Sequence, residues 1–237
     1  MGTIKNPVGV WGILTGDIVR SSHLPENDRG KLQDFFYRGH FSSLGVFPRE
    51  VKIYGPQIFR GDSWQIAVTP AKYSLMIGIT LRAYLKCNFV GTDTRVAIGI
   101  GQLTLLIEEF VSAGLGPAYT LSGNTLDQMV DSRMLLRTQK DYSAQTTTGK
   151  SIDIIVRYMD NFVTNWTPAQ AQAMLGVFQG FNQEQVAANW KPEPITQQAI
   201  SRHLKAANLK LVYESLQFIE SLVEDWEHLE EAKNYDS

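Results

Sequence analysis

The sequence changes character part-way along the chain, and this change constrains the fold more than any other feature. Up to residue 139, short apolar runs typical of buried strands alternate with segments of helical periodicity. From residue 151 onward the periodicity is helical throughout. We predict strands at 8–14, 51–59, 63–69, 95–100 and 134–137, and helices at 25–39, 70–87 and 117–130.

The predicted order in the first half is β-α-β-β-α-β followed by further elements, which is the ferredoxin-like arrangement of an α+β domain. Residues 139–150 are rich in Thr, Ser, Gln and Gly and have little apolar content, which is typical of a linker. A length of 237 residues allows two domains of ordinary size. We therefore predict an α+β domain at 1–145 and an all-α domain at 146–237.

The composition excludes several classes of protein. Hydrophobic residues make up 43% of the chain and charged residues 19%, which excludes an intrinsically disordered chain. Cys87 is the only cysteine, so an internal disulfide, a zinc finger and an iron–sulfur cluster are excluded. The chain has no run of about 18 apolar residues that would predict a membrane span. The first eight residues do not resemble a signal peptide, so we expect a cytoplasmic protein without a membrane partner.

Two acidic residues fall where a ferredoxin-like sheet would bring them together. Asp17 follows the first predicted strand, and Asp62 lies at the tip of the predicted hairpin. Paired carboxylates at one sheet edge suit Mg²⁺ or Mn²⁺, because these cations prefer oxygen ligands. An aspartate at a strand end is also a common turn residue, because its side chain accepts hydrogen bonds from turn amides. The residues alone leave both roles open.

The segments around these aspartates resemble motifs of known enzymes. Residues 16–19, Gly-Asp-Ile-Val, resemble the first metal motif of class III nucleotidyl cyclases. Residues 60–62, Arg-Gly-Asp, resemble the second motif and also the signature hairpin of diguanylate cyclases. Residues 95–101 resemble the next strand, and residues 116–119 resemble the start of the next helix. With a Gly-Asp-x-x-Gln hairpin and a helix-turn-helix-like tail, most of the chain is similar to the SatD family.

The cyclase resemblance implies site residues as well as a fold. It implies that Asp17, Asp62 and the carbonyl of Ile18 bind the metal ion. Arg20 and Arg60 each lie close to a motif aspartate in the sequence, so they are placed to contact a phosphate. The nucleotide itself is not identified by these motifs.

Other cyclase roles fall on residues that cannot perform them. The purine-reading lysine would fall at Ile58, which cannot donate a hydrogen bond, and its acidic partner would fall near Ala113. The transition-state asparagine and arginine would fall at Thr120 and Asn124. Without that arginine, the negative charge that develops on the phosphate loses a stabilising partner. The resemblance therefore implies a nucleotide-binding or metal-binding domain rather than an efficient cyclase.

The second half contains the pattern of a helix-turn-helix unit at residues 167–208. A Thr-Pro pair begins its first helix, and further helices are predicted at 183–190 and 195–208, with a turn at 191–194. The segments 181–187 and 199–204 resemble sigma-factor helix-turn-helix sequences.

The outward face of the third predicted helix is polar and basic, which suits the major groove of DNA. From residue 167 to 211, four basic residues stand against two acidic ones, so the positive charge is small and local. A protein-binding adaptor with the same three helices is the alternative. The residues that we expect to contact DNA are Thr196, Gln197, Gln198, Ser201, Arg202 and Lys205.

The last helix carries a short seam of apolar residues with the four-three spacing of a coiled coil. This pattern predicts either packing against the rest of the tail or a helix that forms a homodimer. The residues of the seam are Val212, Leu216, Ile219, Val223 and Trp226.

These observations favour a DNA-binding transcriptional regulator whose first domain senses a nucleotide or a metal ion, with the ligand biasing the position of the tail. A divergent class III nucleotidyl cyclase, or a related phosphoryl-transfer enzyme, is the first alternative. A non-catalytic protein-interaction adaptor is the second.

Overall fold

The computed structural model describes residues 2–37, 47–89, 91–139 and 146–235, with side chains up to residue 228. It has a mixed α+β architecture, as the sequence predicts. Half of the predicted linker, residues 140–145, and with it the predicted domain boundary, fall between the last two ranges and so lie outside the described residues. The division into two domains stays a prediction.

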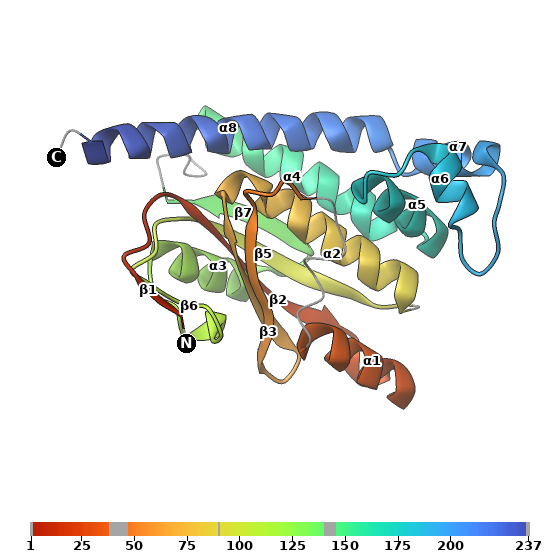
Figure 1. Ribbon diagram of the computed structural model, residues 1–237, viewed down its shortest axis with the longest axis horizontal. Coiled ribbons are helices and arrows are strands. Elements are labelled where there is room, and N and C mark those ends of the chain that lie inside the picture. The colour runs from red at the N-terminus through yellow and green to blue at the C-terminus, as the bar shows by residue number, and fades with distance from the viewer. Residues whose placement is uncertain (1, 38–46, 90, 140–145, 236–237) are drawn as a thin grey trace.

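A five-stranded sheet forms the centre of the molecule (Figure 1). Neighbouring strands are antiparallel except for the last pair, which is parallel. A separate two-stranded sheet joins β1 (Thr3–Lys5) to β6 (Leu105–Ile107). In spatial order, the large sheet consists of β3 (Lys52–Arg60), β4 (Ser63–Thr69), β2 (Trp11–Val19), β5 (Asp93–Gly101) and β7 (Met134–Thr138).

Helices cover both faces of this sheet because its strands are apolar on both sides. On β2, Leu14 belongs to the large apolar cluster beneath α2 (Ser74–Asn88) and α4 (Thr147–Asn165). Its neighbour Ile13 packs on the opposite face with α3 (Pro117–Gln128). Successive strand residues point to opposite faces, which explains this division. The helix α1 (Glu26–Tyr37) packs beside β3 at one end of the sheet (Figure 1).

The second half is helical, as predicted, with small shifts at the helix ends. The first helix of this half, α4, begins at Thr147 rather than at 151. It is followed by α5 (Pro168–Phe178), α6 (Gln183–Ala188), α7 (Gln197–Ala206) and α8 (Leu209–Tyr235). The prediction that the third helix of the unit starts at 195 was wrong, because the Thr196 hydroxyl accepts a hydrogen bond from the Ala199 amide and caps the helix.

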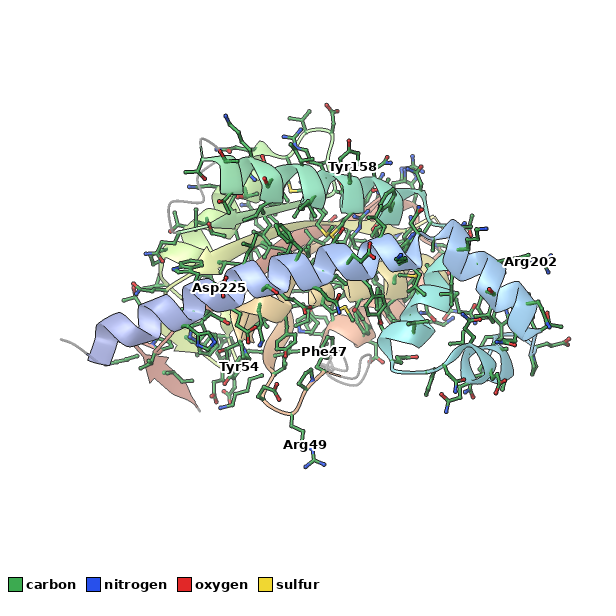
Figure 2. All side chains as sticks on the ribbon, turned by 90° about the horizontal axis from the view of Figure 1, so that it is seen from above. Phe47, Arg49, Tyr54, Tyr158, Arg202 and Asp225 are labelled. Atoms are coloured by element: carbon green, nitrogen blue, oxygen red, sulfur yellow. The ribbon has the colours of Figure 1, made fainter. Side chains whose placement is uncertain are left out.

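The long helix α8 lies along the body of the molecule (Figures 1 and 2). Its apolar seam is buried within this chain, and no seam side chain is more than 2% exposed. The seam therefore packs within this chain, which is the first of the two alternatives that the sequence left open. A homodimer through these residues would need them at the surface, where they do not lie. A single apolar cluster runs from Val10 on the sheet side to Trp226 on α8. Among the described helices, none has both the length and the apolar content needed to cross a bilayer.

Candidate functional site

The first predicted metal ligand is bound by another side chain. Asp17 lies within β2 rather than after it, because β2 continues to pair with β4 and β5 as far as this residue and beyond. It faces Arg95 across the β2–β5 pair. The Asp17 carboxylate accepts hydrogen bonds from Nε and Nη2 of Arg95, the first at 2.9 Å. Both carboxylate oxygens thus hold a cation that the chain itself supplies.

The Arg95 guanidinium also fixes the end of α3. Its Nη1 donates to the carbonyl of Met129, 3.1 Å away. The hydrogen bond to Asp17 raises the pKa of Arg95, against the opposing effect of burial, and the charges of Asp127 and Asp62 raise it further. Arg95 therefore stays protonated and remains a fixed positive charge at this edge of the sheet.

The second predicted ligand, Asp62, has a different partner. It lies in the β3–β4 turn, exposed to solvent, and its carboxylate accepts a hydrogen bond from the Ser21 hydroxyl at 2.8 Å. Its carbonyl accepts from the amide of Ile18 at 3.3 Å. Among the described residues, no group of three or more His, Cys, Asp or Glu side chains is placed to hold a metal ion. As arranged, these residues do not fit a divalent cation, and Mg²⁺ or Mn²⁺ binding stays a prediction.

A cavity of about 340 Å³ brings some of the predicted residues together between α1 and the β3–β4 hairpin. Ile18, Asp62 and Ile58, the position of the missing purine-reading lysine, all line it. Apolar side chains of α1, including Phe36, form much of the opposite wall. Asp17 is not among its described lining residues, because Ile18 and Asp17 are successive strand residues and point to opposite faces.

The cationic residue in this cavity is Arg29, which the sequence analysis missed. Its Nη2 donates to the carbonyls of Ser22 at 3.3 Å and Leu24 at 3.2 Å, so it holds the turn after β2. Arg20 and Arg60, which we expected to contact phosphate, are exposed and do not line the cavity. The sequence pattern that could have identified Arg29 is its position three residues before the buried Leu32, on the same face of α1.

The helix α7 presents the face that the sequence predicts. Ile200 and Leu204 are 0% and 2% exposed and anchor the helix in the core. The hydroxyl of Thr196 caps the helix, so of the six expected residues this one also has a structural role. The remaining five are all exposed: Gln197, Gln198, Ser201, Arg202 and Lys205.

The helices around α7 hold it in a defined orientation. Capping boxes begin both α5 and α6. The indole of Trp190 stacks on the ring of His203, with 5.5 Å between ring centroids and 6° between planes. The indole of Trp166, at the end of α4, donates to the carbonyl of Ala207 at 3.0 Å. Residues 189–196 join α6 to α7, a longer turn than the roughly three to four residues of simpler helix-turn-helix motifs.

A buried ion-pair network, also missed by the sequence analysis, links the sheet to α4. Arg82 on α2 has no exposed surface. Its guanidinium donates to both carboxylate oxygens of Asp93, at 2.9 and 2.8 Å, and to Asp160 on α4 at 2.6 Å. Burial pushes the pKa of Asp93 upward, but the Arg82 charge and hydrogen bonds outweigh burial and lower it. Asp93 therefore stays ionised against the buried guanidinium.

Comparison with known proteins finds a weak structural similarity. No protein-family model matches this chain. No curated protein matches it either. Among solved structures, a bacterial light-regulated adenylyl cyclase is similar to 56% of this chain, with 12% sequence identity and a TM-score of 0.35. The chain matches 44% of the length of that protein. A likeness at this level defines neither a family nor an activity, and the SatD and sigma-factor resemblances stay predictions.

Proposed function

We propose that this protein is a DNA-binding transcriptional regulator that inserts α7 into the major groove. The observation that carries the proposal is the outward face of α7, where polar and basic side chains are exposed while Ile200 and Leu204 hold the helix to the core. Glutamine, serine, arginine and lysine side chains are suited to base edges and phosphates. Figures 1 and 2 show α7 at one end of the molecule, with Arg202 projecting outward.

The distribution of charge supports contact at this end. Between residues 167 and 211, four basic residues stand against two acidic ones. Beyond residue 213 the sequence has eight acidic residues and one lysine, and α8, which includes seven of these acids, runs away from α7 along the body. A phosphate backbone is attracted to the first group and repelled by the second. The charge pattern therefore orients DNA toward the α6–α7 end.

Fluorescence anisotropy with labelled duplex DNA at several salt concentrations tests this proposal. The R202A/K205A variant removes two positive charges from α7, and R49A/K52A removes two exposed charges from a segment before β4. We expect R202A/K205A to weaken binding and to reduce the slope of log affinity against log salt by about 1.8, or about 0.9 per lost phosphate contact. The control should bind as the unchanged protein does. Equal binding by both variants would instead favour the protein-interaction adaptor.

We further propose that the first half is a ferredoxin-like, cyclase-related domain that binds a nucleotide in the cavity beside α1. The antiparallel order β3-β4-β2-β5, with α1 and α2 as the connections, supports this arrangement. The cavity offers both apolar walls and the hydroxyl of Ser22. Equilibrium dialysis with radiolabelled ATP and GTP, on the unchanged protein and on I58D, tests it. Loss of binding in I58D supports the cavity, and retention argues against it.

The enzymatic alternative has less support, because Arg95 occupies both oxygens of Asp17. Incubation with each nucleoside triphosphate and Mn²⁺, followed by a search for cyclic products, separates this alternative from the regulator. Product that disappears in D17A would favour the enzyme.

A further inference from the structure

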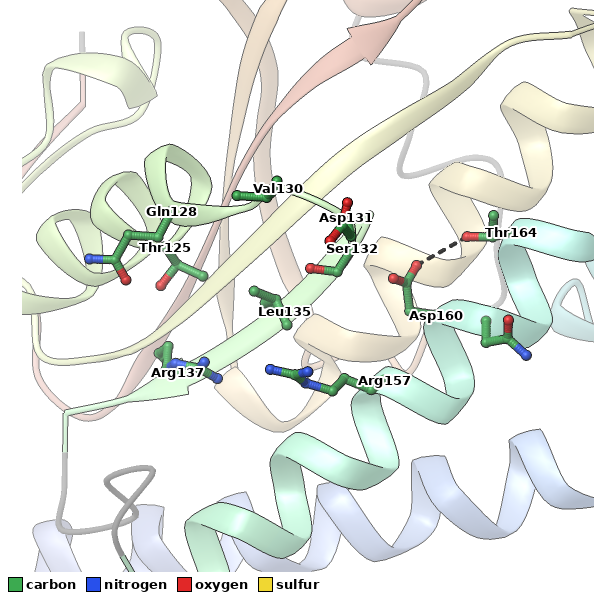
Figure 3. A pocket seen from close by; sticks show the side chains of 11 residues that line it. Thr125, Gln128, Val130, Asp131, Ser132, Leu135, Arg137, Arg157, Asp160 and Thr164 are labelled. Atoms are coloured by element: carbon green, nitrogen blue, oxygen red, sulfur yellow. Dashed lines mark hydrogen bonds between the residues drawn. The ribbon is translucent and has the colours of Figure 1, made fainter.

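A larger cavity, of about 520 Å³, lies at the β7 edge of the sheet between α3 and α4 (Figure 3). It is separate from the cavity beside α1 and from α7, because none of its lining residues belongs to either. Its volume falls within the range of roughly 300 to 1,000 Å³ that is typical of small-molecule sites. The loop 129–133 closes one side, and Leu135 on β7 forms an apolar floor.

Two arginines from different elements line this cavity. Arg137 comes from β7 and Arg157 from α4. Figure 3 shows their guanidinium groups directed toward one another across the lower part of the cavity. Arg137 uses Nη1 to bind Asp153 and the carbonyl of Leu136. Among the residues that the structure describes, Arg157 has no such partner, and it is exposed.

Asp153 balances the charge of Arg137, whereas no ion pair among the described residues balances Arg157, so an anion between the two guanidinium groups would gain most of its attraction from Arg157. The acids nearby leave room for such an anion. Asp160 is already bound to Arg82 and to the amide of Arg133 at 2.8 Å, and Asp153 is bound to Arg137. Asp131 lies at the exposed rim of the cavity.

We infer that this cavity binds a small phosphorylated molecule, with its phosphate between Arg137 and Arg157. A carboxylate is planar and is satisfied by one guanidinium, whereas a phosphate accepts hydrogen bonds from several directions. Hydroxyl and amide donors of Thr125, Ser132 and Asn161 lie on the other sides of the cavity. The space exceeds what a phosphate fills, and Leu135 gives the organic part of the ligand an apolar surface.

Calorimetric titration with inorganic phosphate at constant ionic strength tests this inference on the full chain. We expect saturable binding that R157Q weakens by about tenfold or more, as loss of one charge-assisted hydrogen bond predicts. R49Q is the matched control, because Arg49 does not line the cavity and projects into solvent on the side opposite Tyr158 of α4 (Figure 2), and it should bind as the unchanged protein does. Since Arg157 is exposed, R157Q should keep the far-ultraviolet circular dichroism spectrum of the unchanged protein.

Three results would overturn the inference. One is the absence of saturable phosphate binding to the unchanged protein. Another is an equal loss of binding in R157Q and R49Q, which would indicate general charge attraction. The third is succinate binding as tight as phosphate binding, which would show a carboxylate site instead. DNA binding is measured separately with R202A/K205A. A negative phosphate-binding result therefore does not test the proposed regulator function, and a negative DNA-binding result does not test this cavity.

Discussion

Asp17 on β2 and Arg202 on α7 are both charged, and they sit in opposite environments. The Asp17 carboxylate is partly buried and holds Arg95 through two hydrogen bonds. The Arg202 guanidinium projects into solvent from a helix whose buried face is apolar. A charge with a partner inside the chain contributes to stability, whereas an exposed charge is available to a ligand. The predictions below separate these two uses of charge.

The largest effect on stability is expected at Arg82, whose partners are the most buried. R82M removes the guanidinium that Asp93 and Asp160 share and leaves Asp93 with the more distant cations of Lys86 and Arg133, at 3.6 and 3.7 Å. We expect this change to lower the free energy of unfolding by about 3–5 kcal/mol. Urea denaturation followed by tryptophan fluorescence measures this. R49M, at an exposed position, should change the value by less than about 0.5 kcal/mol. A loss below 1 kcal/mol in R82M would show that the buried network does not link α2 to α4.

The second largest effect is a pH dependence of stability at the contact between α8 and residue 71. Burial raises the pKa of Glu227 to about 7, although the amide of Ala71 donates to its carboxylate at 2.6 Å. Because this pKa lies above the value of an unfolded glutamate, the folded state favours the protonated form. The contribution of Glu227 to the free energy of unfolding is therefore complete below about pH 4.5 and is lost as the pH rises through 7. After allowance for partial exposure, we expect this loss to be about 2 kcal/mol.

Glutamine has no charge to lose, so E227Q should flatten the stability profile between about pH 4.5 and 7 while keeping the acceptor for Ala71. Urea midpoints measured across this pH range give the result. E214Q is the control, because the Glu214 side chain is more than half exposed. An unchanged slope in E227Q would assign the pH dependence to another group.

A smaller loss is expected at the paired edge of the sheet. D17N keeps the shape of the side chain and removes its charge, and we expect about 1 kcal/mol of destabilisation because the pair is partly exposed. D131N, at an exposed position, is the comparison. Stabilisation in D17N would mean that the carboxylate is strained in the ligand-free protein, as a binding site often is.

The smallest effect on stability is expected on α7. R202A/K205A should change the free energy of unfolding by less than about 0.5 kcal/mol while it weakens DNA binding. Thermal unfolding followed by circular dichroism measures the first quantity. A loss above 2 kcal/mol would show that these side chains pack against the protein, and the comparison with Asp17 would no longer hold.

The local sequence pattern was enough to predict which residues of α7 are exposed, but it was not enough to predict the side-chain partners at the edge of the sheet. The exposed and buried positions of a helix follow from its own periodicity, so Arg202 could be placed outside from a few neighbours. The Asp17–Arg95 pair depends on the register of two strands 78 residues apart in the chain, which no local pattern contains. The same reason hid Arg82, whose partner Asp160 also lies 78 residues away. In addition, Thr15, Gly16 and Asp17 interrupt the apolar run, so the predicted strand ended at residue 14 although β2 continues to Val19.

The helix α8 has 27 residues, which at a rise of about 1.5 Å per residue makes a rod of about 40 Å. Toward its far end it is tied to the short 3-10 turn Ala71–Tyr73, which precedes α2, because Lys72 donates to Glu224 and the Ala71 amide donates to Glu227. Its near end follows α7 after two residues, Ala207 and Asn208. The tied residues lie about 23 to 27 Å along the helix from Leu209, so a tilt of about 5° at this point displaces the α7 end of α8 by about 2 Å. That displacement is more than half the rise of one base pair, about 3.4 Å, so in the proposed DNA complex the attachment of α8 to residues 71–72 would influence where α7 meets the groove.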